Sequence, residues 1–144
     1  MVQWLPTINQ YCDFCQVQVE NRSHLFFECP CTMVIWKNIL AQNGIRRHIR
    51  GWNEELNWMI KASKGKDLAA KILKISFLAC IYCIWAERNR RRFKNRIIEI
   101  PILLAKVRKI VRGRASLLHN IKPSQGNVFL SEIWRLPTSI FAYS

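Results

Sequence analysis

Three cysteines and one histidine near the start of the chain, Cys12, Cys15, His24 and Cys29, have the spacing C-x2-C-x8-H-x4-C. Three thiolates and one imidazole are a common ligand set for structural Zn²⁺, which binds four protein ligands as a tetrahedron. Such a site leaves no position for water or substrate. We therefore expect one structural zinc ion that holds the fold and takes no part in catalysis.

The residues around these ligands predict how they would meet. The two residues between Cys12 and Cys15 predict a tight turn, and residues 21–23 predict a second turn before the apolar run 25–27. We expect this run to be the return strand of a short hairpin. The hairpin would bring His24 back to the metal, within a zinc knuckle at residues 11–31.

Pro30 suits the first position of a helix, which would place Cys29 at the N-cap, where the helix dipole favours a thiolate. Cys31 is more consistent with the first helical turn, although it could replace Cys29 as a ligand. Disulfides are the alternative for these cysteines in a secreted chain. Residues 1–10 show no secretory signal, so we expect an intracellular protein, in the nucleus or cytoplasm and not secreted.

The chain is strongly basic, with 23 Lys and Arg against nine Asp and Glu in 144 residues, a formal charge of +14. This balance attracts polyanions, so RNA or DNA is the expected class of partner. An acidic membrane surface is negatively charged, as nucleic acid is, and would also attract this chain. A membrane-spanning helix is not expected, because the most apolar stretch, residues 72–85, is interrupted by Lys74 and is shorter than the roughly 20 residues that a span needs. We expect no membrane partner and no small-molecule substrate.

The apolar periodicity predicts a mostly α-helical chain, with the knuckle followed by a bundle of about four helices. Capping residues and prolines predict where they start, and we place the helices at 30–42, from 53, from 67 to about 95, and from about 101. Gly113 either ends or weakens the fourth helix. We expect one domain, residues 1–122, with its helical part at 30–118, and a loop-like tail at 123–144.

The long third helix is expected to bury one apolar seam, made of Leu68, Ile72, Ile75, Leu78, Ala79, Tyr82 and Trp85. Cys80 and Cys83 in this helix form a second C-x2-C motif, a spacing that also occurs in redox sites. Buried cysteines that act as small hydrophobic residues fit the apolar surroundings better. No nucleophile with an orienting acid, no carboxylate cluster and no glycine-rich phosphate loop stands out, so we expect no enzyme.

Four segments together resemble a known family: CDFC, NRSHLFFECP and VIW, then IYCIWAERNRRRF about fifty residues later. They are similar to the reverse-transcriptase zinc-binding domain of plant LINE-type (non-LTR) retrotransposons and of stand-alone proteins derived from them. The resemblance implies that Cys12, Cys15, His24 and Cys29 are the metal ligands. It also implies a non-catalytic module that helps a reverse-transcriptase polypeptide to handle nucleic acid. Trp4–Thr7 departs from the pattern, because the related segment lies further upstream in the family.

The basic run after Trp85 has two interpretations. It is either the solvated end of a helix, with Glu87 and Arg91 as an i,i+4 pair, or part of a surface that binds phosphates without sequence preference. The candidate phosphate-binding residues are Arg88, Arg91, Arg92, Lys94, Lys106, Lys109 and Arg112. The alternative function is a structural or protein-interaction remnant without nucleic-acid binding.

Overall fold

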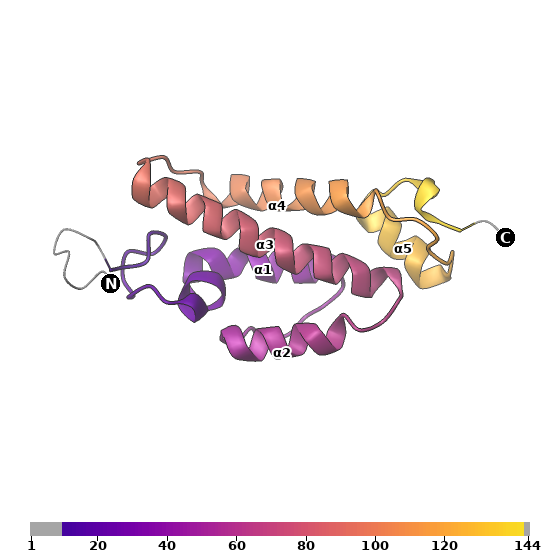
Figure 1. Ribbon diagram of the computed structural model, residues 1–144, viewed down its shortest axis with the longest axis horizontal. Coiled ribbons are helices and arrows are strands. Elements are labelled where there is room, and N and C mark those ends of the chain that lie inside the picture. Colours follow the sequence, from indigo (N-terminus) through magenta and orange to yellow (C-terminus); the bar gives the residue numbers. More distant parts are fainter. Residues whose placement is uncertain (1–9, 143–144) are drawn as a thin grey trace.

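The computed structural model describes residues 10–142, and they are mostly helical, as predicted (Figure 1). A π-helical turn, η2 (His24–Glu28), is followed by the helices α1 (Pro30–Gln42), α2 (Trp52–Ala62), α3 (Leu68–Phe93), α4 (Ile100–Ala115) and α5 (Gln125–Ile133), and by the 3₁₀ turn η3 (Thr138–Ile140). The predicted long third helix is α3. The segment Trp4–Thr7 lies outside the described residues.

The helices are arranged around α3 (Figure 1). α4 runs antiparallel along α3, α1 packs against both α3 and α4, α2 packs against α3, and α5 lies near the first turns of α3. The chain before α1 folds against the opposite end of α3, where that helix finishes. The two ends of α3 are therefore covered by segments from the two ends of the chain.

Local sequence signals set several helix boundaries. Asp67 is the N-cap of α3, and its Oδ1 accepts a hydrogen bond from the Ala70 amide at 3.1 Å. Proline occupies the first turn of both α1 and α4, where no hydrogen-bonded amide is lost. Gly113 does not end α4, which continues to Ala115. Of the two roles predicted for this glycine, only a weakening one fits the structure.

Five aromatic rings form the centre of the core on the α1 and α2 side: Phe26, Phe27, Trp36, Trp52 and Phe77. Neighbouring ring centroids lie 5.4–6.4 Å apart in tilted, stacked and edge-on contacts. Rings at these distances contribute about 0.5–1.5 kcal/mol per pair beyond their burial. The cluster joins η2 to three helices.

The predicted return strand is wrong. Residues 25–27 lie in the helical turn η2, and an isolated antiparallel bridge between Tyr11 and Val19 is the only β pairing before α1 in the described residues. Three consecutive apolar residues do not distinguish a strand from a fully buried helical turn. Here all three are buried, because α1 and α3 both pack against the turn.

The predicted apolar seam of α3 is partly wrong. Leu68, Ile72 and Ala79 are buried, but Leu78 and Tyr82 are 62% and 68% exposed, and Trp85 is 47% exposed. Four helices, α1, α2, α4 and α5, contact α3, so its buried surface is wider than one seam and does not include those three side chains. The buried set also contains Leu73, Ser76, Phe77, Cys80, Cys83, Ile84 and Glu87.

The second helix begins at Trp52, one residue before the predicted cap, and buries an acid. Glu55 is fully buried, with its Oε2 accepting a hydrogen bond from Trp36 Nε1 at 3.1 Å. Its Oε1 accepts from the Arg50 amide at 2.8 Å and pairs with the guanidinium of Arg47. Glu55 therefore links the segment between α1 and α2 to both helices. Its position in the first turn of a helix did not predict this role.

The tail at 123–144, predicted to be loop-like, contains α5 and η3. Trp134 is fully buried and donates a hydrogen bond from its indole Nε1 to Asn43 Oδ1 at 2.9 Å. A bridge between Ile121 and Phe141 ties the last described residues back to the chain. The packed unit thus extends past residue 122, through residue 142.

Candidate metal centre

The four predicted ligands converge on one point. The ligand atoms of Cys12, Cys15, His24 and Cys29 all lie within 4.8 Å of one another. Cys12 Sγ is 3.9 Å from Cys29 Sγ, and Cys15 Sγ is 3.3 Å from His24 Nε2. No other group of three or more metal-binding side chains of this kind occurs in residues 10–142.

The first pair of ligands is held by a tight turn. The Phe14 amide donates to Cys12 Sγ at 3.4 Å, and the Gln16 amide donates to the Cys12 carbonyl at 2.9 Å. Gln16 closes the turn in a left-handed conformation, with φ of 60°. The chain then returns beside its own start, where the Cys12 amide donates to the carbonyl of Gln18 at 2.8 Å. Both sulfurs consequently face the same side of the turn.

The second pair of ligands comes from the two ends of η2. The Asn21 carboxamide oxygen accepts a hydrogen bond from the His24 amide at 2.8 Å and so starts the turn. The Cys29 amide donates to the His24 carbonyl at 2.8 Å, five residues back, which places the two side chains on one side. Cys29 is also the N-cap of α1, as predicted, with Pro30 following it.

Cys31 lies outside the group of four ligand atoms. Its Sγ points to the Phe14 carbonyl at 3.7 Å, and its side chain is partly exposed. Burial, followed by the neighbouring charge of Cys29, raises the pKa of the Cys31 thiol. The geometry therefore favours Cys29 over Cys31 as the fourth ligand.

Burial and hydrogen bonding change the pKa values of two of these thiols. Cys12 and Cys29 are fully buried, and His24 is 6% exposed. The hydrogen bond from Cys12 lowers the pKa of the Cys29 thiol to about 4 and raises that of Cys12 far above its usual range. The two sulfurs lie 3.9 Å apart, close enough for one divalent cation to bind both.

The donor set and its spacing fit Zn²⁺. Tetrahedral coordination with Zn–S of about 2.3 Å and Zn–N of about 2.0–2.1 Å gives S–S edges of about 3.8 Å and S–N edges of about 3.6 Å. The sulfur–sulfur distance of 3.9 Å and the sulfur–nitrogen distance of 3.3 Å lie close to these edges. A single ion could bind all four side chains after only small movements.

The second C-x2-C pair does not join the metal centre. Cys80 and Cys83 lie in the middle of α3 and are 1% and 4% exposed. Burial raises the pKa of both thiols, which disfavours the reactive thiolate. They pack in the core, as predicted from their apolar neighbours.

Three of the predicted phosphate-binding residues contact the knuckle instead. Arg88 forms an ion pair with Glu20 at 2.8 Å, and Arg92 forms one with Asp13 at 2.8 Å. Arg91 donates to the Asp13 carbonyl at 3.3 Å and lies over the Phe14 ring, 4.4 Å from its centroid. We call the group Arg88, Arg91 and Arg92 with Asp13, Glu20 and Glu87 the arginine clamp.

Glu87 anchors the clamp within α3. Its side chain is fully buried and pairs with Arg91 at 2.8 Å and with Arg90 at 3.0 Å. The Ile98 amide, in the connection to α4, donates to the same carboxylate at 2.8 Å. Burial acts to raise the pKa of Glu87, but the hydrogen bonds from Arg91, Ile98 and Arg90 outweigh it, so the pKa lies below its usual value. The predicted pair with Arg91 is confirmed, although it is buried rather than solvated.

The remaining basic candidates are exposed. Lys94 follows α3, and Lys106, Lys109 and Arg112 lie on the outer side of α4. Arg112 also donates from Nε to the Trp134 carbonyl at 3.2 Å, which leaves its terminal nitrogens available. The seven predicted residues thus divide into three within the clamp and four on the surface.

α3 is also long and apolar enough, by length and composition alone, to cross a membrane. Its most apolar stretch has a mean hydropathy of 1.8, and 56% of that stretch is buried within the fold. The core helix of a globular domain has the same properties.

Comparison of the chain with protein-family models, with curated proteins and with solved structures gave no match. The Cys3His cluster and the charge around it are the features of the described residues that bear on function.

Proposed function

We propose that this chain is a non-catalytic zinc-binding module whose metal is structural. The convergence of Cys12, Cys15, His24 and Cys29 within 4.8 Å is the observation on which this rests. Four protein ligands saturate a tetrahedral ion, so no position remains for a reacting water or substrate. When bound, the ion would supply a cross-link between the turn at Cys12 and the start of α1.

The proposed origin is a retrotransposon reverse-transcriptase zinc-binding domain. Its support is the sequence resemblance, together with the fact that the four residues on the family's proposed ligand positions lie in one cluster. The run Trp85 to Phe93, which carries the second half of the resemblance, also contributes the arginines that hold the knuckle. The two motifs thus meet in space, as one structural unit.

We further propose non-specific binding of RNA or DNA through exposed basic residues at the end of α3 and on α4. The candidates are now Lys94, Lys106, Lys109 and Arg112, because the clamp arginines are only 11–14% exposed and already paired. The formal charge of +14 supplies a long-range attraction for phosphates. Contacts to phosphate give affinity without sequence preference.

The zinc proposal is tested by metal analysis. Purified protein should contain about one zinc ion per chain, and chelation should lower its melting temperature, because the binding free energy of a structural zinc ion contributes to folding. Cys29→Ser should lose the metal, whereas the matched change Cys31→Ser should retain it. Metal-free protein with an unchanged melting temperature would contradict the proposal.

The nucleic-acid proposal is tested by the salt dependence of binding. Affinity for a labelled single-stranded RNA or a DNA duplex should fall linearly on a log–log plot against salt. The triple charge reversal Lys106→Glu, Lys109→Glu and Arg112→Glu should weaken binding and flatten that slope.

The control for this experiment is a triple reversal of equal charge on the far side of the molecule, Lys61→Glu, Lys64→Glu and Lys66→Glu, at and after the end of α2. These three lysines are also exposed. An equal loss in both variants would show that net charge alone drives binding. No binding at low salt would leave the module without a nucleic-acid role.

A further inference from the structure

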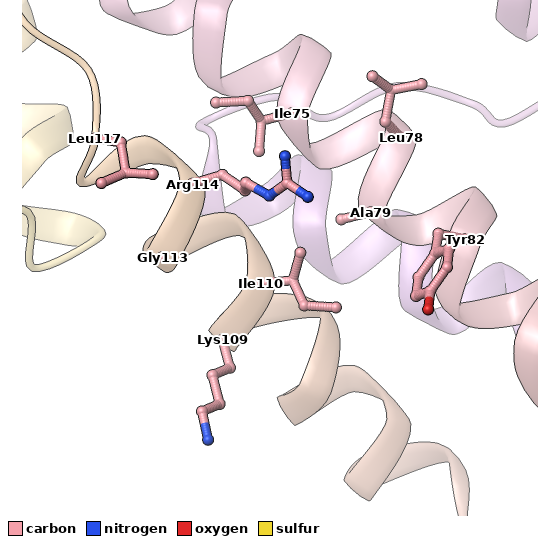
Figure 2. A pocket seen from close by; sticks show the side chains of 9 residues that line it. All are labelled: Ile75, Leu78, Ala79, Tyr82, Lys109, Ile110, Gly113, Arg114 and Leu117. Carbon is pink, nitrogen blue, oxygen red and sulfur yellow. The ribbon is translucent and has the colours of Figure 1, made fainter.

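A groove runs between the middle of α3 and the C-terminal part of α4 (Figure 2). It has a volume of about 860 Å³ and is lined by Ile75, Leu78, Ala79, Tyr82, Lys109, Ile110, Gly113, Arg114 and Leu117. It lies outside the metal centre and shares one residue, Lys109, with the basic surface proposed above.

The walls of the groove are apolar and open to solvent. Leu78 and Tyr82 on α3 are 62% and 68% exposed, and Leu117 just after α4 is 77% exposed. Figure 2 shows Leu78 and Tyr82 on one wall and Ile110 on the other. These three large apolar side chains line one groove, so they form a small shared surface and are not exposed singly.

Gly113 leaves the α4 wall of the groove without a side chain. A Cβ atom added at this position would meet no other atom within 4 Å. Glycine inside a helix costs about 1 kcal/mol relative to alanine. The helix is therefore less stable at Gly113 than it would be with alanine, at the point where the groove is open.

Two basic side chains line the groove. Lys109 and Arg114 are both exposed, and no acidic side chain is among the lining residues. In Figure 2 the Arg114 side chain extends from α4 towards Ile75 and Ala79, whereas Lys109 extends away from the helix pair. An occupant must therefore combine an apolar face with negative charge.

We propose that this groove binds an acidic amphipathic helix of a partner protein. The α3 wall from Ile75 to Tyr82 spans about 10 Å, the length of about two helical turns. A helix with apolar residues at i, i+3, i+4 and i+7 presents such a stripe, and acidic residues beside the stripe would pair with Lys109 and Arg114. The proposal does not rest on zinc or nucleic-acid binding, although Lys109 belongs to both this groove and the proposed phosphate-binding surface.

Other occupants fit the same surface less well. A second copy of the chain also carries a formal charge of +14, so two copies would repel each other at a site that is itself basic. Nucleic acid matches the charge, but aliphatic side chains cover most of the walls and offer no hydrogen-bond donors or acceptors to base edges. A flat anionic lipid surface does not fill a hollow between two helices.

The test uses a synthetic labelled peptide of about four helical turns, with Leu and Trp at i, i+3, i+4 and i+7 and Glu at most other positions. The control peptide has the same composition in an order that places its apolar residues on no single face. Binding to the zinc-loaded full chain is measured by fluorescence anisotropy. The amphipathic peptide should bind about tenfold tighter than the control peptide, because only its apolar stripe can enter the groove.

Variants of the chain then locate the binding site. Gly113→Trp fills the groove and should weaken the amphipathic peptide about tenfold or more, whereas Gly113→Ala adds only a methyl group and should bind as the original chain does. Tyr82→Ala with Leu117→Ser removes two exposed side chains and provides a second test if Gly113→Trp disturbs folding. Arg114→Glu should weaken the acidic peptide more than Lys61→Glu, which changes the charge equally at a distance.

Equal binding of the two peptides, or binding unaffected by both groove variants, would overturn the proposal. The same titrations with single-stranded RNA and with anionic phospholipid vesicles identify rival occupants. Loss of either interaction in Gly113→Trp, without loss of peptide binding, would assign the groove to that ligand. Concentration-dependent dimerisation of the chain that Gly113→Trp abolishes would assign it to a second copy.

Discussion

Single residues carry much of the connection between the metal centre and the rest of the fold. Arg88 and Arg92 lie more than sixty positions after their acidic partners Glu20 and Asp13, yet each pair is 2.8 Å apart. Glu87 holds the arginine beside them in place. A side chain that a helical pattern assigns to the solvated end of α3 is thus part of the interior.

Glu87→Gln tests this interior role. It should reduce the free energy of unfolding by about 3 kcal/mol, because Arg90 and Arg91 would lose a buried counter-charge. Urea denaturation measures the change, and Glu99→Gln, at an exposed acid, should have little effect. A loss below about 0.5 kcal/mol in Glu87→Gln would show that the pairs contribute no more than surface ones.

The pH dependence of the same variant has a defined sign. The pKa of Glu87 is lowered in the folded protein, so its stabilisation is complete above the usual carboxyl pKa. It is lost as the pH falls below that value, through the lowered pKa. The difference in unfolding free energy between the original chain and Glu87→Gln should therefore be largest near neutral pH and shrink in acid. A difference that is constant with pH would contradict this account.

At the scale of elements, helix ends follow local sequence more closely than helix faces do. Asp67 caps α3 and Pro30 begins α1, as their side chains predict. The face of α3 was harder to predict, because α1, α2, α4 and α5 all pack against this helix. An apolar residue such as Tyr82 then remains exposed, although its spacing suits a core seam.

For α4 we predict the effect of Gly113→Ala on stability. It should raise the free energy of unfolding by about 0.5–1 kcal/mol, since alanine favours the helix and its methyl group meets no neighbour. Thermal unfolding measures the gain. Gly126→Ala in the first turn of α5, where the added Cβ also meets nothing, is a matched comparison at a helix end. A loss of stability in Gly113→Ala would show that α4 bends or moves at this glycine.

At the scale of the whole molecule, the described segments before α1 and after α4 lie at the two ends of α3 (Figure 1). The metal-ligand cluster could be predicted because each pair of ligands is set by a short segment. The clamp and the docking of α5 could not, because they depend on contacts between residues 59–91 positions apart, such as Trp134 with Asn43 and Asn127 with Leu68. No short window of sequence contains both partners.

Removal of residues 123–144 tests whether the tail belongs to the cooperative unit. The shortened chain should unfold at a lower temperature, since it lacks the fully buried Trp134. Trp134→Ala alone should cost about 3–5 kcal/mol. Thermal and urea unfolding measure both changes, and Phe129→Ala, at an exposed position of α5, is the control. Unchanged unfolding of the shortened chain would restore a domain boundary at residue 122.

The position of the clamp affects how variants of the metal ligands must be interpreted. Asp13 and Glu20 lie in the same short segment as Cys12 and Cys15. They form ion pairs with Arg92 and Arg88 near the end of α3. A ligand substitution that loosens this segment would also unmask positive charge some seventy positions away. Such a mutant would then bind polyanions more strongly, because the guanidinium groups have lost their acidic partners. A genetic experiment that treats a cysteine substitution as a simple loss of function would attribute this stronger binding to the wrong cause.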